Sequence, residues 1–167
     1  MSMKQLKLLE KFNKRETTEH GGDLSQGKRK TARPIAVKRA MHVVFRSDNA
    51  KGSTSFTRKN QSIRSVLQKE SKRFYVKLYK VAICGNHIHM CVKAKTKEGL
   101  KNFLRATSGQ IAKLSKIKLW STIPYTRIIE WGKAFKEVIQ YVHKNELETR
   151  GLIPYTPRKR KRPQVNF

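Results

Sequence analysis

Acidic residues are scarce in this sequence. Only 11 Asp and Glu residues stand against 39 Lys and Arg residues over 167 positions, which gives a formal net charge of +28 at pH 7. A charge of this size governs solubility and the choice of partner rather than the fold. It fits the phosphate backbone of a nucleic acid best, because each neutralised phosphate releases counterions and so drives binding. We therefore expect a nucleic-acid partner.

Long apolar runs and cysteines are also lacking. No stretch is long enough to span or anchor in a bilayer, so a membrane surface is the weaker alternative and we expect no membrane partner. The first residues contain no apolar signal-peptide region. With only Cys84 and Cys91 in the chain, a disulfide is not required. The default compartment is then the reducing cytoplasm, in association with the nucleoid.

The length favours one domain with irregular ends. We assign residues 34–155 to this domain. Residues 1–33 are polar, basic and contain glycine, which is typical of an extension. Residues 156–167 form a basic tail that is either simply solvated or clamps nucleic acid. Its five consecutive cations are Arg158, Lys159, Arg160, Lys161 and Arg162.

Hydrophobic periodicity in the domain alternates between strand and helix. The order β-α-β-β-α-β-α predicts an α+β, ferredoxin-like split βαβ fold. In this fold two helices cover one face of a four-stranded antiparallel sheet, and the seventh element can cover the other face. The predicted strands span residues 40–47, 76–85, 87–94 and 125–131, and the predicted helices span residues 59–74, 97–116 and 133–148.

Two histidines occupy one strand in the segment CGNHIHMCVK. His87 and His89 are two residues apart and so project to the same face, while Ile88 points to the other. Neutral imidazole is a common metal ligand, so the pair could bind one divalent ion. The alternative is a pair of half-exposed histidines that face solvent. Zinc bound with Cys91 is less favoured, because no carboxylate base lies nearby and Cys91 fits packing.

The last predicted helix contains a second pair of polar side chains. Tyr141 and Asn145 are four residues apart and share one flank of its apolar stripe. The side-chain oxygen of asparagine is a good ligand for a hard ion such as Mg²⁺. The alternative is a surface tyrosine beside an ordinary helical asparagine.

These segments together resemble a known family. GNHIHM resembles the His-hydrophobic-His motif of the HUH single-strand endonucleases. MHVVFR, with His42, resembles their first strand, and YVHKNELETRGLI resembles their final helix with its tyrosine. The match is closest to the REP-associated tyrosine transposases and their relatives, the small insertion-sequence transposases with one catalytic tyrosine. It covers roughly residues 33–155, with Gly85 and Glu146 at positions where the family usually has proline.

The resemblance implies a DNA endonuclease and transposase. His87, His89 and Asn145 would bind Mg²⁺ or Mn²⁺, and Tyr141 would attack the phosphorus to give a 5′-phosphotyrosine and a free 3′-hydroxyl. His42 would either assist in the site or simply face it, without binding the ion itself. The substrate would be single-stranded DNA flanked by hairpins, bound by a monomer or a homodimer. Further contacts with nucleic acid are expected from Arg46, Arg105 and Arg127.

A non-catalytic protein that binds RNA or DNA on the same scaffold is the competing hypothesis. The fold cannot decide between the two, because it hosts many functions. Only the histidines, Tyr141 and Asn145 discriminate, since a simple binding protein does not need them in one cluster. Trp120 and Trp131 are expected in the core, and Trp120, in a loop, is the better candidate for base stacking.

Overall fold

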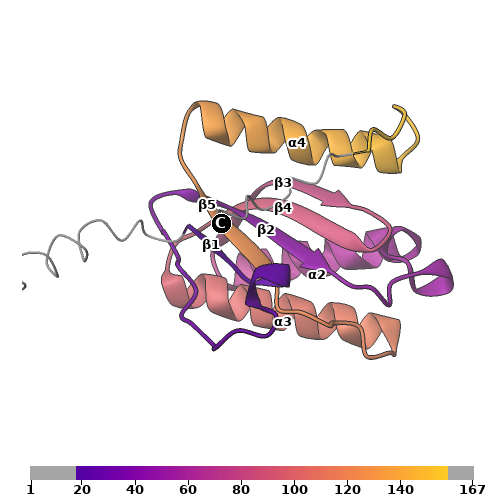
Figure 1. The fold of residues 1–167 in the computed structure, drawn as a ribbon, viewed down its shortest axis with the longest axis horizontal. Coiled ribbons are helices and arrows are strands. Elements are labelled where there is room, and N and C mark those ends of the chain that lie inside the picture. Colours follow the sequence, from indigo (N-terminus) through magenta and orange to yellow (C-terminus); the bar gives the residue numbers. More distant parts are fainter. Residues whose placement is uncertain (1–17, 158–167) are drawn as a thin grey trace, which may run out of the picture.

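The computed structural model describes residues 18–157 (Figure 1). The basic segment from Arg158 to Arg162 lies outside the described residues. No helix within residues 18–157 is both long and apolar enough to cross a bilayer. The strands are β1 (Glu19–His20), β2 (Ala40–Arg46), β3 (Val76–Ile83), β4 (His87–Ala94) and β5 (Tyr125–Ile129). The α-helices are α2 (Asn60–Arg73), α3 (Lys97–Ser115) and α4 (Lys133–Thr149), and the 3₁₀ turns are η1 (Gly22–Ser25), η2 (Gly52–Thr54) and η3 (Phe56–Lys59).

The strands form one antiparallel sheet in the order β1-β5-β2-β4-β3. Elements β2 to β5, with α2 and α3, have the order and pairing of the split βαβ arrangement, so the predicted ferredoxin-like fold is confirmed. Helices α2 and α3 lie on one face of the sheet (Figure 1). Their apolar residues pack there against alternate residues of the central strands, among them Val43, Ile88 and Met90. The alternation leaves the intervening residues of β2 and β4 for the opposite face.

A fifth strand, β1, extends the sheet beyond the four predicted strands. It lies within residues 1–33 and pairs with β5 through Glu19 and Arg127. Two residues are too few to give a periodic signal, which explains why the pattern showed only an extension. Gly21 allows the close approach, because its φ is 86° and a Cβ there would lie 2.1 Å from the Pro124 carbonyl oxygen. Arg33 holds the same loop by donating to Pro124 O at 2.9 Å.

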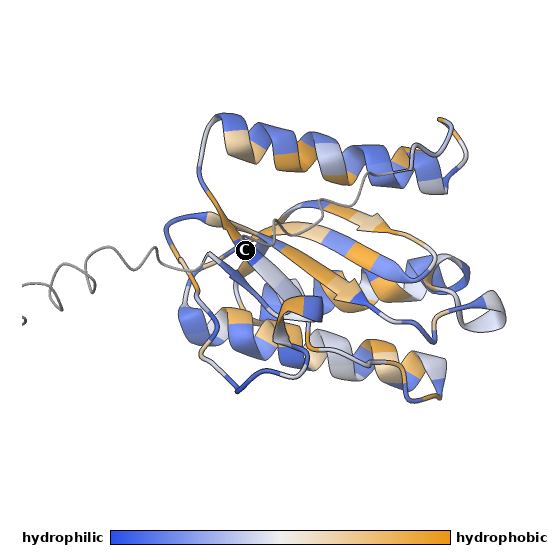
Figure 2. Ribbon diagram, in the orientation of Figure 1, coloured by the Kyte–Doolittle hydropathy of each residue, from blue (hydrophilic) through white to orange (hydrophobic). Residues whose placement is uncertain are grey.

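Helix α4 covers part of the second face of the sheet, mainly over β3 and β4 (Figures 1 and 2). Its buried Val138 and Val142 pack against Ala40 of β2 and Cys91 of β4 in a small second core. Helix α4 covers β2 and β5 less, so this face of the sheet stays open over those two strands. The predicted C-terminal helix therefore lies across the same face as the histidines.

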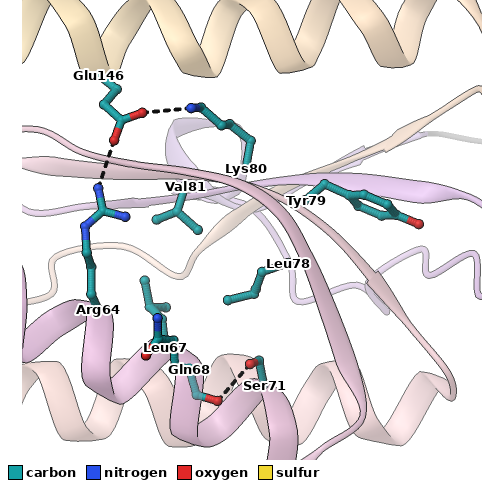
Figure 3. Close-up of a pocket in the computed structure, with 9 residues that line it drawn as sticks. All are labelled: Arg64, Leu67, Gln68, Ser71, Leu78, Tyr79, Lys80, Val81 and Glu146. Atoms are coloured by element: carbon teal, nitrogen blue, oxygen red, sulfur yellow. Dashed lines mark hydrogen bonds and ion pairs between the residues drawn. The ribbon is translucent and has the colours of Figure 1, made fainter.

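An ion-pair network ties α4 to the rest of the domain. Glu146 of α4 accepts from Arg64 Nη2 of α2 at 3.0 Å and lies 2.9 Å from Lys80 Nζ of β3 (Figure 3). Burial alone would raise the pKa of the Glu146 carboxyl, but the hydrogen bonds and charges of Lys80 and Arg64 outweigh it and lower the pKa. The folded state therefore favours the ionised carboxylate.

Glu146→Gln should lower the free energy of unfolding by roughly 1–2 kcal/mol at neutral pH, because it leaves Arg64 and Lys80 without their counter-charge. Since the pKa of Glu146 is lower in the folded protein than in the unfolded chain, this stabilisation is complete above the ordinary pKa of 4.5. It is lost as the pH falls through the lowered folded value. Urea unfolding of both proteins at neutral and at acidic pH measures the difference.

Glu98→Gln is the matched control. Glu98 pairs with Lys101 at 2.7 Å, but its side chain is 71% exposed, so its removal should change the stability by well under 1 kcal/mol. Equal losses for the two variants would show that the Glu146 network adds nothing beyond a surface pair.

Candidate active site

His87 and His89 project from β4 toward the α4 side of the sheet, as their spacing predicts. Their ring centroids are 4.7 Å apart with the planes nearly perpendicular. Ile88, between them, is fully buried in the core on the other side. The register pairs His89 with Val44 and His87 with Arg46 of β2. The two imidazoles therefore lie side by side at the start of β4.

Hydrogen bonds at the Nδ1 atoms orient both rings. His87 Nδ1 donates to Asn86 Oδ1 at 2.7 Å, because an amide oxygen can only accept. His89 Nδ1 is 3.2 Å from His42 Nε2. If His89 Nδ1 donates in this pair, the Nε2 atoms of both His87 and His89 keep their lone pairs. This is the usual arrangement for histidines that bind a metal.

His42 lies on β2 beside the pair and stacks on His89 with ring centroids 5.4 Å apart. Burial, and next the positive charge of Arg127, lower the pKa of His42 to about 4. The ring is therefore neutral at physiological pH and can accept a hydrogen bond from His89. His42 thus lies beside His89, one of the two predicted ligands.

Tyr141 reaches the histidines from α4. Its ring centroid lies 5.3 Å from that of His89 and 5.8 Å from that of His42, edge to face in both cases. The buried Val138 and Val142 fix the rotation of α4 that aims the phenol at the sheet. The tyrosine and the two predicted ligands thus meet within one chain.

Asn145 lies one helical turn after Tyr141 and is only 3% exposed. Its side-chain Nδ2 donates to the Tyr141 carbonyl oxygen at 2.7 Å. The backbone carbonyl oxygen of Asn145 accepts from Cys84 Sγ at 3.8 Å, and Cys84 N donates to His87 O at 2.9 Å. These contacts place Asn145 next to the β3–β4 turn that leads into His87. The amide nitrogen is turned back to the helix, so the oxygen is the end suited to an ion.

Residues 18–157 contain no group of three or more His, Cys, Asp and Glu side chains that could hold a metal ion. Any further protein donor to an ion at the histidine pair would therefore be a neutral group such as the amide of Asn145. Cys91 does not fit, because it is fully buried and burial raises the pKa of its thiol to about 12. Its place in the small core agrees with the packing role and disfavours the zinc alternative.

A cavity of about 530 Å³ opens beside Tyr141, where α4 leaves β2 and β5 uncovered. Tyr125, Arg127 and Glu137 line it together with the two histidines His42 and His89. Burial, and next the charge and hydrogen bond of Glu19, raise the pKa of Tyr125 above its usual range. Tyr125 and Glu137 had no motif to reveal them, because only the sheet register and the packing of α4 bring them to the site. Asn86 directly precedes His87 in the GNHIHM segment.

The predicted DNA-contacting arginines are divided between the two sides of the molecule. Arg127 lines the cavity, and Arg46 lines a neighbouring pocket that shares Val44 and Tyr125 with it. Arg46 lies near Asp23 and Asp48, both at 3.5 Å. Arg105 is exposed on α3, on the opposite side of the sheet. Arg127 thus lies at the Tyr141 cavity, Arg46 lies at the pocket beside it, and Arg105 lies on the other side of the sheet.

The sequence model of a protein family described as "Transposase IS200 like" matches residues 36–145. The chain belongs to this family of IS200-like transposases. Membership in a transposase family implies DNA binding and DNA cleavage in general terms. No curated protein sequence matches the chain.

Nine chains of solved structures match this one, and two of them are described as transposases. One is a REP-associated tyrosine transposase bound to a REP hairpin, with a TM-score of 0.64 and 13% identity over 75% of this chain and 76% of that one. The other is a putative transposase from Deinococcus radiodurans, with a TM-score of 0.42 and 12% identity over 71% of this chain and 98% of that one. The first likeness supports the fold, and the family assignment agrees with it.

The environment of the cysteines predicts that both are unreactive in the folded transposase. Cys84 and Cys91 are buried, and the raised pKa of Cys91 keeps its thiol protonated. Alkylation by iodoacetamide, followed by mass spectrometry, should be slow for the native protein and fast in urea. Rapid alkylation of native Cys91 would contradict its assignment as a packing residue.

Proposed function

We propose that this transposase is a metal-dependent endonuclease that nicks and rejoins single-stranded DNA through a covalent bond to Tyr141. The observation that supports the proposal most is the approach of the Tyr141 ring to His89 within a single chain. A protein that only binds nucleic acid gains nothing from a phenol directed at paired imidazoles. The convergence therefore favours the enzyme over the non-catalytic binding protein.

His87, His89 and Asn145 are the residues that would hold Mg²⁺ or Mn²⁺. The hydrogen bonds at Nδ1 of both rings and the orientation of the Asn145 amide fit such a role. When bound, the ion would supply a Lewis acid that polarises the scissile phosphate. The protein's part is to fix the two rings, and His42 and Asn86 would do so.

The phenol oxygen of Tyr141 would form the new bond to phosphorus. The bond from phosphorus to the 3′ oxygen would break, and this oxygen would leave with a proton as a 3′-hydroxyl. The phenol must give up its proton in this step, and Arg127, which lines the same cavity, would supply positive charge beside the phosphate. Attack of another 3′-hydroxyl on the phosphotyrosine would reverse the step and rejoin the strand.

Single-stranded DNA with an adjacent hairpin is the proposed substrate. The REP-associated transposase of similar fold is bound to a REP hairpin. In the present chain, the cavity beside Tyr141 is open along β2 and β5 and contains Arg127. Tyr141 and the proposed ligands belong to one chain, so cleavage does not require a tyrosine from a second subunit.

Tyr141→Phe should abolish the covalent adduct that forms with single-stranded DNA and Mg²⁺ and that survives denaturing gel electrophoresis. DNA binding, measured by fluorescence anisotropy, should change little, because only the phenol oxygen is removed. Tyr155→Phe is the matched control, since Tyr155 is 69% exposed and lies outside the site. An adduct that persists in Tyr141→Phe would identify a different nucleophile.

The role of His42 can be tested without catalysis. His42→Leu removes the partner of His89 Nδ1 and should weaken Mn²⁺ binding about 10- to 100-fold, as measured by electron paramagnetic resonance. His42→Gln retains an oxygen that can accept from Nδ1 and should recover part of this affinity. His143→Leu, at an exposed histidine of α4, should have no effect. An unchanged Mn²⁺ affinity in His42→Leu would show that His42 does not orient the ligand.

A further inference from the structure

A second group of aromatic and cationic side chains lies near the start of α4, at the other end of the strands from His87. We call it the aromatic–lysine strip. Each of its three rings has an ammonium group above it. The Nζ atoms of Lys77, Lys93 and Lys95 lie 5.0, 5.6 and 5.6 Å from the ring centroids of Tyr79, Trp131 and Tyr75, respectively.

The sheet register gathers these residues on the face that bears the histidines. Lys93 follows His89 by four positions on β4, so both project to the same side. Lys77 is the Cα partner of Lys93, and Lys95 N donates to Tyr75 O at 3.1 Å. An irregularity between Leu78 and Lys80 interrupts the alternation of β3. Tyr79 therefore joins the α4 side, where its ring lies 5.2 Å from Phe135.

Trp131 is both exposed and fixed in orientation. It is 45% exposed, yet its Nε1 donates to the Lys38 carbonyl oxygen at 2.9 Å. Its ring also packs at 4.9 Å from Phe135 and 5.9 Å from Tyr79. The expectation of a core tryptophan is wrong for this residue. A rigid, exposed indole is suited to stacking, because little side-chain freedom is lost on binding.

Trp120, the better stacking candidate by sequence, has a structural role. Its ring packs against Phe45 and Phe56 at 5.5 and 5.8 Å. Its Nε1 donates to the Ser108 carbonyl oxygen at 2.9 Å. Of the two tryptophans, Trp131 is thus the one available to a ligand.

The charge around the strip is complementary to phosphate. Its three lysines have no acidic partner within the strip, and the neighbouring Glu130 is bound by Arg39 at 2.7 Å. Aromatic rings beside lysines are the combination with which proteins bind single strands, because bases stack on rings while ammonium groups neutralise phosphates. An apolar protein partner would gain little from burying three ammonium groups.

We propose that the aromatic–lysine strip binds an unpaired segment of the DNA substrate, with a base stacked on Trp131 and phosphates near Lys77 and Lys93. The proposal rests on single-stranded DNA being the substrate of the Tyr141 site. Tyr141 follows the first residue of α4, Lys133, by eight positions, or ~12 Å along the helix axis. A strand that has one phosphate at Tyr141 can therefore reach the strip within a few nucleotides.

Trp131→Ala tests the stacking contact. An oligo(dT) of about a dozen nucleotides should bind the variant about 5- to 100-fold more weakly, because one stacked base is lost. An abasic oligonucleotide of the same length keeps the phosphates and should bind wild type and variant equally. Tyr155→Ala, which removes an exposed ring outside the strip, is the control. Equal oligo(dT) affinities for Trp131→Ala and wild type would overturn the proposal.

Intrinsic fluorescence tests the same contact without a variant that could misfold. Stacking on the exposed Trp131 should quench part of the emission of the unaltered protein when oligo(dT) binds, whereas Trp120 is shielded by its packing. The abasic oligonucleotide should give much less quenching. Saturating oligo(dT) that leaves the emission unchanged would show that Trp131 does not meet a base.

The lysines can be tested by salt dependence. The double variant Lys77→Ala with Lys93→Ala should reduce the slope of log affinity against log salt by about 1.4, for two phosphate contacts on a single strand. Lys97→Ala with Lys113→Ala, at exposed lysines of α3, removes the same charge from the opposite side. Equal changes of the salt slope in the two double variants would show that Lys77 and Lys93 attract DNA only through general charge. That result would overturn their proposed phosphate contacts in the strip.

The Tyr141→Phe variant separates the two proposals. It should lose the covalent adduct and keep the Trp131-dependent quenching. Absence of an adduct in both the wild-type protein and the variant would refute the nuclease, and absence of quenching in both would refute the strip.

Discussion

The packing of α4 on the sheet is the interaction on which the site depends. Val138 and Val142 bury themselves against Ala40 and Cys91, and this contact sets both the rotation and the height of the helix. Tyr141 then faces the histidines, and Asn145 comes next to the strand turn before His87. The polar groups alone could not fix this geometry, because a single hydrogen bond contributes only about 1 kcal/mol net.

The ion pairs of Glu146 help to orient α4 in addition to this apolar contact. They join α4 to both α2 and β3, on the side of the helix away from the cavity. Glu146 stands where the resembled transposases usually have proline. A proline cannot form such pairs, so in this chain the charge of Glu146 helps to fix the last turns of α4. The difference concerns how the helix is held and leaves Tyr141 and Asn145 in place.

The sequence predicted the ferredoxin-like core and the shared face of His87 and His89, because both follow from strong periodicities within single elements. The nearness of Tyr141 to His89 was expected from the family resemblance, and periodicity alone could not have supplied it. What the pattern missed depends on contacts between distant segments. Strand β1 is two residues long, and Gly21, directly after it, makes the close approach to Pro124 that no periodicity could reveal. Trp131 looked like a core residue, and only its contacts with Lys38, Phe135 and Tyr79 show how it stays exposed and ordered.

The irregularity in β3 has a consequence for the evolution of this chain. One extra residue at the edge of the sheet lets Tyr79 and Lys80 serve the same side, the first under Phe135 and the second toward Glu146. A deletion at this point would restore regular alternation and leave a single residue there on the α4 side, so either the contact with Phe135 or the ion pair with Glu146 would be lost. Both of these contacts therefore constrain the length of this edge strand, although no residue in it belongs to the catalytic motif.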